Sequence, residues 1–374
     1  MLYQTHAQIH LANIRHNIEG IRHAIGQQCK ILIAVKANAY GHGAVEVSRM
    51  AQNIGVNWLG VATVPEGMQL REAGIYLPIL KFSPAFPEEM ECAVENELTL
   101  TVCDKANIQA LQRVCQRLKL TARVHLKIDS GMGRIGVTPG EAPELAKFIH
   151  SRCSNLLLEG VFTHLPVSDS MGNDYTQDQI DRFKSVVLTI EDAIGAKVPL
   201  AHCANSGGVL DYPQSWMDMV RPGIMIYGFY PGEPSSHRVD LKPGLSLRTR
   251  VSFIKKVEKG TSIGYGRTWF APQDTWIATI PAGYADGFNR LFSNTGRVLI
   301  DGVSYPVVGR VCMDQSMINL GAETHVKVGD EVVLIGRSGA EEISSYEWAE
   351  KLNTITYEVT CQINQRVPRV FDPY

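Results

Sequence analysis

The stretch Ile31-Leu32-Ile33-Ala34-Val35-Lys36 is the first of eight short apolar runs between residues 31 and 227. The other seven runs are 58–62, 77–82, 98–102, 122–128, 157–163, 199–204 and 219–227. Successive runs begin about 27 residues apart, close to the length of one strand plus one crossover helix. Segments 105–118 and 176–194, which lie between runs, have apolar residues at helical spacing. Eight such units in series predict an α/β fold, a TIM-like (β/α)8 barrel rather than an open sheet.

The alternation of predicted strands and helices ends at residues 230–244, which contain three prolines and have the composition of a linker. Further apolar runs then follow closely, separated by Gly-rich turns: 246–257, 276–280, 296–300, 304–308 and 331–335. One clear helix is predicted there, over 344–352. We therefore predict a barrel over residues 1–240, whose first strand-like residues could join the other domain, and a mostly antiparallel β domain over 241–374.

Composition narrows the class of protein. Of the 374 residues, 45% are hydrophobic and 20% are charged, which is typical of a folded globular chain. The net charge of −2 provides no positive field for nucleic acid or an anionic membrane. The N-terminus lacks a signal-peptide pattern and no apolar run approaches 20 residues, so a cytoplasmic location is expected. The 8 cysteines form no Cys-x-x-Cys pair, and no metal site is predicted.

Lys36 ends the first apolar run. Alternation places Leu32, Ala34 and Lys36 on one strand face, which would direct Lys36 into the barrel mouth where active sites of this fold lie. A lysine desolvated there becomes a nucleophilic amine able to form a Schiff base. The alternative is an ordinary ion-paired or snorkelling lysine.

Polar residues also line one face of the run 122–128. His125, Lys127 and Asp129 share that face, and Lys127 and Asp129 could simply neutralise each other. Residues 131–136 (GMGRIG) then match a GxGxxG pattern, but Pro139-Gly140 follows at once, and a dinucleotide fingerprint should open a helix. We prefer Arg134 as an anion-binding side chain on a tight Gly loop.

Two Gly-rich loops follow the seventh and eighth runs. They are Asn205-Ser206-Gly207-Gly208 and Arg221-Pro222-Gly223-Ile224, and barrels commonly bind phosphate at these positions. Ordinary Gly turns remain the alternative for each. A Schiff-base lysine together with a phosphate cup indicates pyridoxal phosphate.

Two loops of the β domain carry further candidates. Tyr265 lies between Gly264 and Gly266, and Met313-Asp314 lies within GRVCMDQ (309–315). An interior structural tyrosine is the usual case, and only an opposed second base would make Tyr265 catalytic.

With these motifs the sequence closely resembles the alanine racemase family, nearly end to end. The shared motifs are AVKANAYGHG (34–43), HLKIDSGMGRIG (125–136), HCANSGG (202–208), RPGIMIYG (221–228), GYGRTW (264–269), PAGYADG (281–287), GRVCMDQ (309–315) and YEVTCQINQRVPR (357–369). The resemblance implies pyridoxal 5'-phosphate as cofactor and a homodimer with shared active sites.

The resemblance also implies roles for individual residues. Lys36 would bind the cofactor and act as one base, and Tyr265 of the partner subunit would be the opposed base. Arg221 would pair with the pyridine nitrogen of the cofactor. Because arginine stays protonated, the pyridine nitrogen would remain unprotonated. Further cofactor-binding residues would be Tyr40, His164, His202, Asn205, Ser206, Gly223, Ile224 and Tyr357. Arg134 and the Met313 amide would bind the substrate carboxylate, supported by Lys127 as a carbamate, Asp314 and Tyr284.

The implied activity is interconversion of L-alanine and D-alanine, which supplies D-alanine for peptidoglycan. A serine or broad-specificity racemase of the same family is the alternative, because Met313, Tyr284 and Tyr357 suggest a small pocket only by analogy. Two rivals keep the cofactor. Related decarboxylases lack the GYGRTW tyrosine arrangement, and noncatalytic carriers lack the β domain.

Overall fold

The computed structural model describes residues 2–170, 174–232, 236 and 238–374, and it divides into two compact units. The barrel unit comprises Asn13–Ala39 and Gly43–Lys242, and the β unit comprises Met1–Ala12, Tyr40–His42 and Pro243–Tyr374. The main division falls between Lys242 and Pro243, and the N-terminal strand joins the β unit, a possibility that the sequence left open. The segment Tyr40–His42 also belongs to the β unit, which was not predicted. Residues 233–235 and 237 of the predicted linker lie outside the described residues.

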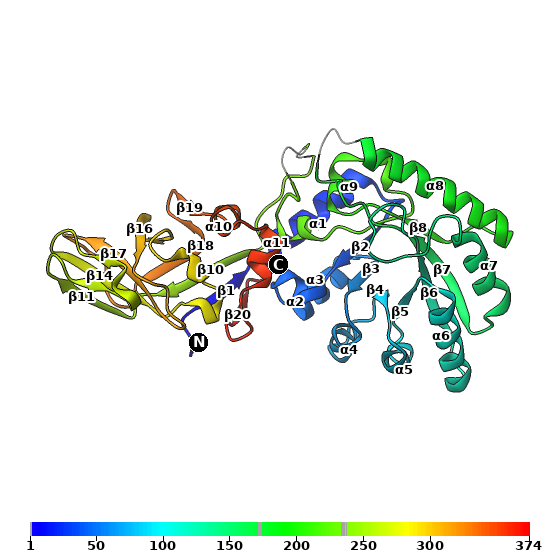
Figure 1. Cartoon of the computed structure of the whole chain (residues 1–374), viewed down its shortest axis with the longest axis horizontal. Coiled ribbons are helices and arrows are strands. Elements are labelled where there is room, and N and C mark those ends of the chain that lie inside the picture. The colour runs from blue at the N-terminus through cyan, green and yellow to red at the C-terminus, as the bar shows by residue number, and fades with distance from the viewer. Residues whose placement is uncertain (1, 171–173, 233–235, 237) are drawn as a thin grey trace. The chain divides into compact units, whose positions relative to one another are not determined.

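Parallel strands form the barrel unit, as predicted. Within the described residues, eight strands pair in the order β8-β7-β6-β5-β4-β3-β2-β9, every pair parallel (Figure 1). They are β2 (Lys30–Ala34), β3 (Trp58–Val61), β4 (Ile79–Pro84), β5 (Thr99–Val102), β6 (Ala122–Lys127), β7 (Leu156–Phe162), β8 (Leu200–His202) and β9 (Met219–Val220). The amide of Arg221 donates to Ala204 O at 2.9 Å, which links the segments after β8 and β9 and nearly closes the barrel.

Helices cover the outside of this barrel (Figure 1). They are α1 (Leu11–Ile25), α3 (Ala44–Asn53), α4 (Val64–Glu72), α5 (Pro87–Glu95), α6 (Lys105–Leu118), α7 (Ala142–Arg152) and α8 (Asp174–Ile194), with the short α9 (Ser206–Asp211) after β8. Helix α6 has the predicted bounds. Asp104 caps it by accepting from the Asn107 amide, and Ile108, Leu111 and Cys115 form its buried face.

The barrel interior is apolar at its centre. One inward side chain from each of six strands joins the core cluster: Leu32, Trp58, Leu80, Phe162, Leu200 and Met219. Because Leu32 points inward, alternation gives the same face to Ala34, as predicted for the strand that leads to Lys36. The eighth run was predicted too long, since β9 ends at Val220 and residues Ile224–Tyr227 form a buried 3-10 turn.

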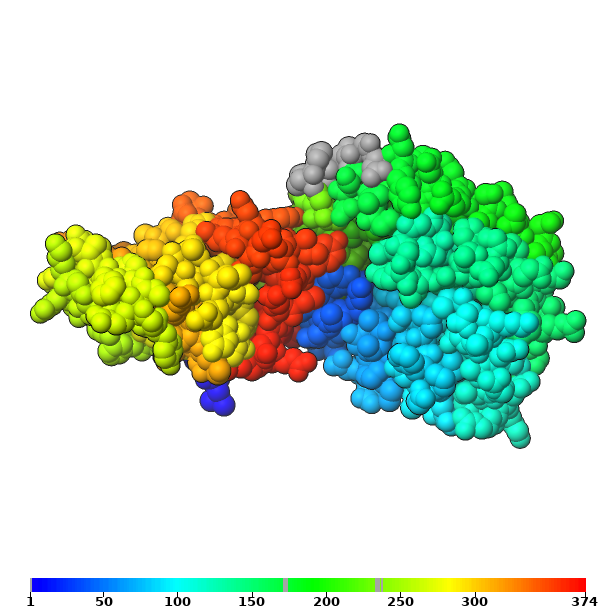
Figure 2. All heavy atoms as spheres, viewed as in Figure 1, coloured from blue at the N-terminus to red at the C-terminus, as the bar shows by residue number. Residues whose placement is uncertain are grey.

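The β unit is mostly antiparallel, as predicted. Its large sheet has the order β11-β14-β17-β16-β15-β18-β10-β1-β20, with β19 on β18 and a separate pair β12-β13. The strands are β1 (His6–Ile9), β10 (Leu245–Arg250), β11 (Phe253–Val257), β12 (Ser262–Ile263), β13 (Trp269–Phe270), β14 (Thr275–Ile280), β15 (Arg297–Ile300), β16 (Val303–Val308), β17 (Ser316–Gly321), β18 (Glu331–Ser338), β19 (Glu341–Ile343) and β20 (Arg369–Phe371). Strand β1 pairs with β10 and β20, and the first residues, in blue, lie against this unit (Figure 2).

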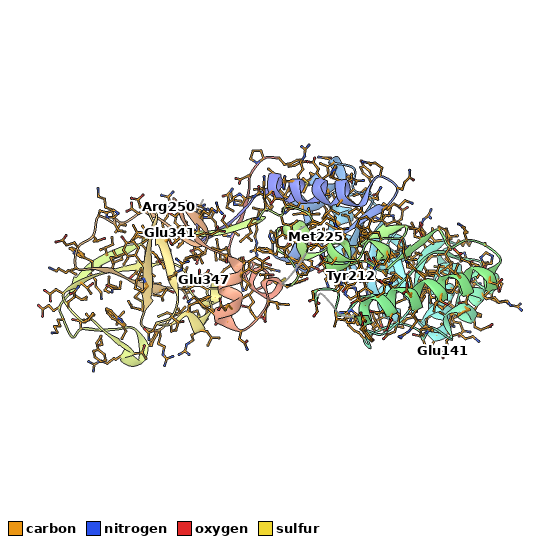
Figure 3. The ribbon with its side chains drawn as sticks, turned by 90° about the horizontal axis from the view of Figure 1, so that it is seen from above. Glu141, Tyr212, Met225, Arg250, Glu341 and Glu347 are labelled. Carbon is orange, nitrogen blue, oxygen red and sulfur yellow. The ribbon has the colours of Figure 1, made fainter. Side chains whose placement is uncertain are left out.

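Two details of the β unit differ from prediction. The run 246–257 contains two strands, β10 and β11, with different partners. The predicted helix is α10 (Ser345–Leu352), but a second short helix, α11 (Thr356–Cys361), follows it. Arg297 fixes α10 to the sheet through two bonds to the carboxylate of Glu347, which is labelled in Figure 3.

Leu80→Ala should test the barrel core. Leu80 is fully buried, so the substitution should lower the free energy of unfolding by about 2–5 kcal/mol. Denaturant unfolding measures the loss. The matched control is Leu157→Ala on β7, where 47% of the residue is exposed and the loss should be under about 1 kcal/mol. Equal losses for both variants would contradict the assigned core.

Candidate active site

Lys36 begins an unusual turn at the end of β2. The next four residues, Ala37, Asn38, Ala39 and Tyr40, all have positive φ between 51° and 54°, so the chain makes a left-handed turn. L-residues adopt this conformation only at a cost of about 1–2 kcal/mol each, and such strain gathers at functional sites. The turn holds Lys36 at the carboxyl end of the barrel strands, as predicted.

Contacts from other segments stabilise this turn. The Ala37 amide donates to Glu66 Oε1 at 2.7 Å, and Glu66 Oε2 also accepts from the amides of Ala62 and Thr63. On the far side, Asn38 Oδ1 accepts from the Ala44 amide at 2.8 Å. Glu66 therefore fixes the backbone beside Lys36, a role that the sequence analysis missed. Its position three residues after Thr63 signals only a helix capping box.

Arg221 is a buried cation inside the barrel. Its Nη1 bonds to His202 Nδ1 at 2.8 Å, and its Nη2 donates to the carbonyls of Thr163 and Cys203. Burial lowers the pKa of Arg221 to about 10, so it remains charged at neutral pH. Among the described residues no carboxylate pairs with it and no group accepts from its Nε, which leaves that donor for a bound molecule.

Two buried histidines continue from Arg221. Because Arg221 donates to His202 Nδ1, His202 carries its proton on Nε2 and donates to His125 Nδ1 at 2.9 Å. His125 Nε2 then faces Glu159 Oε2 at 3.6 Å. Burial lowers the pKa of both histidines, and the charge of Arg221 lowers each further. The pair is therefore neutral, and His202 is the side-chain acceptor for Arg221.

Lys127 lies deep in the same interior. It is 4% exposed, with Nζ 4.1 Å from the ring centroid of Phe162. Burial, followed by the charges of Arg221 and Arg134, holds the pKa of Lys127 well below its ordinary value. The alternative in which Lys127 pairs with Asp129 is wrong. Asp129 Oδ1 accepts instead from the amides of Gly131, Met132 and Gly133.

These amide bonds shape the loop that carries Arg134. The loop does not open a helix, since α7 begins only at Ala142, so the GxGxxG pattern is not a dinucleotide fingerprint here. Helix α8 holds the loop from outside through two donors: Tyr175 Oη to Gly131 O at 2.7 Å and Arg182 Nη1 to Ser130 O at 2.9 Å. The sequence analysis missed both, and Arg134 itself is exposed.

His164 follows β7 in the barrel unit. Gln179 of α8 donates to its carbonyl at 2.9 Å. Burial, then the charges of Lys127, Arg221, Arg134 and Lys36, hold the pKa of His164 well below its ordinary value. His164 is therefore neutral at physiological pH, and it adds no charge to a bound molecule.

Ser206 and Gly223 meet after β8 and β9. Ser206 Oγ accepts from the Gly223 amide at 3.0 Å and from the amide of Met225, which is labelled in Figure 3, at 3.4 Å. Because the Ser206 hydroxyl accepts both bonds, it keeps its own proton and can donate it to an anion. Asn205 Oδ1 caps α9 by accepting from the Gly208 amide at 3.0 Å.

The β unit presents Tyr265 to solvent. Tyr265 is 74% exposed on a turn whose flanking residues, Gly264 and Gly266, both have positive φ. The alternative of an interior structural tyrosine is therefore wrong. A groove of about 480 Å³ adjoins it, lined by Phe253, Ile263, Cys312 and Met317 among others.

Two further loops of the β unit support each other. The amides of Tyr284 and Ala285 donate to the carbonyls of Cys312 and Met313, both at 3.0 Å. Arg366 joins the loops by ion pairs with Asp286 and Asp314, each at 2.8 Å. Met313, Asp314 and Tyr284 are all exposed.

Tyr40 and Tyr357 also lie together in the β unit. Their ring centroids are 5.9 Å apart, and Tyr40 is buried. Burial raises the pKa of Tyr40, so its phenol stays protonated and can donate a hydrogen bond. Across the described residues no group of three His, Cys, Asp or Glu side chains could hold a metal ion, and no helix could cross a membrane.

His202→Asn should change the acid stability of the protein. Below about pH 6.5 an unfolded histidine binds a proton that folded His202 does not, because its folded pKa is lowered. The free energy of unfolding should therefore fall as the pH decreases, by about 1.4 kcal/mol per pH unit from His202 alone. Urea unfolding at several pH values should show this slope, and the variant should lack that part of it.

The control for this slope is Leu80→Ala, which removes no ionisable group and should lower stability equally at every pH. An unchanged slope in His202→Asn would contradict the neutral, buried state of this imidazole.

Comparison with known proteins places both units in one family. Residues 9–231 match the family described as alanine racemase, N-terminal domain, and residues 244–371 match alanine racemase, C-terminal domain. The curated alanine racemase of Cutibacterium acnes is 49% identical over 98% of this chain and 97% of its own length. The alanine racemase of Halothermothrix orenii is 41% identical over 98% of this chain and 96% of its own length.

Solved structures agree with the sequence relatives. An alanine racemase of Clostridium difficile 630 has a TM-score of 0.95 at 38% identity, covering 100% of this chain and 96% of its own. An alanine racemase from Bacillus anthracis with bound L-Ala-P has a TM-score of 0.92 at 37% identity, and the match covers 100% of this chain and 96% of that one. Since two family profiles and full-length relatives agree on the whole chain, it belongs to the alanine racemase family and is an isomerase.

Proposed function

We propose that this protein interconverts L-alanine and D-alanine with pyridoxal 5'-phosphate, in the cytoplasm, as a homodimer that supplies D-alanine for peptidoglycan. The observation that carries the proposal is Arg221, a buried guanidinium whose Nε has no acceptor in the described chain. An aromatic ring nitrogen would accept from that donor. The relatives named above are themselves called alanine racemases.

The donor set suits the three polar parts of the cofactor. The amine of Lys36 would react with the aldehyde of the cofactor, and Arg221 would donate to its ring nitrogen. The amides of Gly223 and Ile224, together with Ser206, would bind its phosphate. Tyr40 and Tyr357 would add phenol donors to the phosphate, and neutral His164 would flank the ring. Asn205 would act through its cap on α9. When bound, pyridoxal phosphate withdraws electrons from the substrate Cα and so acidifies the α-proton.

The remaining work belongs to side chains of this protein. Arg134 and the Met313 amide would fix the substrate carboxylate, with Asp314 and Tyr284 supporting the Met313 loop. Lys36 Nζ and the Oη of Tyr265 of the partner subunit would act on opposite faces of Cα, one accepting the proton and the other donating one. Inversion requires such opposed groups. The exposure of Tyr265 beside a groove lined by both polar and apolar side chains supports its use by a second copy.

The first test is incubation of the protein with L-alanine or L-serine in deuterated water, with and without added pyridoxal phosphate. We expect cofactor-dependent D-alanine with deuterium at Cα, and the alanine-to-serine ratio separates alanine racemase from a broad-specificity racemase. Lys36→Ala should abolish both exchange and the visible absorption of attached cofactor. Tyr265→Phe should keep that absorption and slow racemisation by about 10²–10⁴-fold.

The controls address the dimer and the rival activities. Tyr76→Phe alters another exposed tyrosine and should change nothing. Mixed Lys36→Ala and Tyr265→Phe subunits should recover roughly a quarter of the activity, because heterodimers carry one intact shared site. Cofactor absorption without exchange would instead favour a decarboxylase or a carrier. Full activity in Tyr265→Phe would contradict the two-base assignment.

We also propose that Lys127 is carbamylated. Its neutral, buried amine can attack carbon dioxide, forming an N–C bond and releasing a proton, and the product anion would orient Arg134. With ¹³C-bicarbonate the protein should show a carbamate carbon resonance that Lys127→Met abolishes. Lys81→Met is the matched control, since Lys81 is also buried but its Nζ donates to the carbonyls of Ser83 and Pro84. No resonance in the unsubstituted protein would refute the modification.

A further inference from the structure

Three residues that begin with Tyr40, the last residue of the left-handed turn, form a strap within the β unit. The strap, Tyr40–His42, belongs to this unit although the chain on both sides of it belongs to the barrel unit. Gly41 O accepts from Arg369 Nε at 3.0 Å. A Cβ on Gly41 would lie 2.2 Å from Thr360 O, so the strap packs directly on the backbone of α11.

The strap cannot hold this conformation by itself. Tyr40 has φ 53° and Gly41 has φ 85°, both in the left-handed region. A non-glycine residue keeps such a conformation only where the surrounding structure enforces it. Inside the strap, His42 Nδ1 bonds to the carbonyl of Tyr40 at 2.9 Å. The C-terminal segment adds restraint from outside, through Arg369 and the backbone of Thr360.

Arg369 is built to supply it. Arg369 lies on β20, which pairs with β1 at Ala7. Its Nη1 donates to the carbonyls of Asn364 and Val367, and its Nη2 donates to Ile363 O at 2.7 Å. These bonds fix the guanidinium plane and direct Nε at the strap. Lysine has no such planar fork and cannot make the four bonds together.

We propose that Arg369 is a positioning residue for the phosphate end of the cofactor. By fixing the Gly41 carbonyl it fixes the backbone of Tyr40, whose buried phenol lies 5.9 Å, ring to ring, from that of Tyr357. The inference rests on the proposed function, because it takes these two phenols as phosphate ligands. Arg369 touches neither the cofactor nor the substrate and acts through the strap.

The test compares pyridoxal phosphate with pyridoxal, which lacks the phosphate, by titrating the full-length protein and measuring both dissociation constants. In Arg369→Lys the constant for pyridoxal phosphate should rise by about tenfold. The constant for pyridoxal should stay within about twofold, since Lys36 is untouched. Tyr40→Phe should have the same selective effect. The double variant Arg369→Lys/Tyr40→Phe should bind pyridoxal phosphate no more weakly than the single variant with the larger dissociation constant.

The matched control is Arg250→Lys, labelled in Figure 3, which alters another arginine of the β unit that donates to a glycine carbonyl, Gly329 O. It should leave both constants unchanged. Gly41→Ala provides a second route, because its Cβ would displace the strap from Thr360 while Arg369 stays intact.

Three outcomes separate the hypotheses. A phosphate-selective loss in both Arg369→Lys and Gly41→Ala supports the positioning role. An unchanged preference for the phosphate form, or an equal loss for both ligands, overturns it, because the first shows no role and the second a merely structural one. If the unsubstituted protein binds neither ligand, the proposed function itself fails.

Discussion

The uncompensated charge of Arg221 is the constraint on which the barrel interior depends. A guanidinium removed from water loses a large hydration energy, and among the described residues no carboxylate bonds to that of Arg221. Two carbonyl oxygens, from Thr163 and Cys203, and the lone pair of His202 replace the lost water. The same residue also closes the sheet, since its amide bonds to Ala204 O. The backbone of Arg221 thus helps to close the barrel, and its side chain is buried inside it.

This constraint sets the protonation of the neighbouring groups. A second cation near a buried guanidinium would raise its cost, so His202, His164 and Lys127 all have lowered pKa values, with burial as the first cause. Arg221 is therefore a permanent positive charge beside neutral histidines. Such an environment favours partners that bring electron pairs or negative charge, and a permanent cation pairs with a ring nitrogen without giving it a proton.

Much of the fold could be predicted because burial imposes a period on the sequence. Helix α6 has its predicted bounds, since its apolar spacing and the Asp104 cap agree. The run 219–227 was wrongly predicted to be one strand, because burial gives a strand and a buried turn the same apolar pattern. Residues Ile224–Tyr227 are all buried, but they form a 3-10 turn after Pro222 and Gly223, and a continuous apolar run does not distinguish a strand from a buried turn.

The site was predictable only where position in the fold decides it. Lys36 follows from alternation along β2 and from the rule that barrel sites lie at the carboxyl ends of strands. The turn after it could not be predicted, because Ala37 and Ala39 ordinarily favour right-handed structure. Its restraint comes from Glu66 on α4, and this contact exists only once β2 and β3 have paired. A strained segment is therefore recognised by the residues elsewhere in the fold that hold it in place. A single sequence does not show which residues these are, because they contact the segment only in the folded chain.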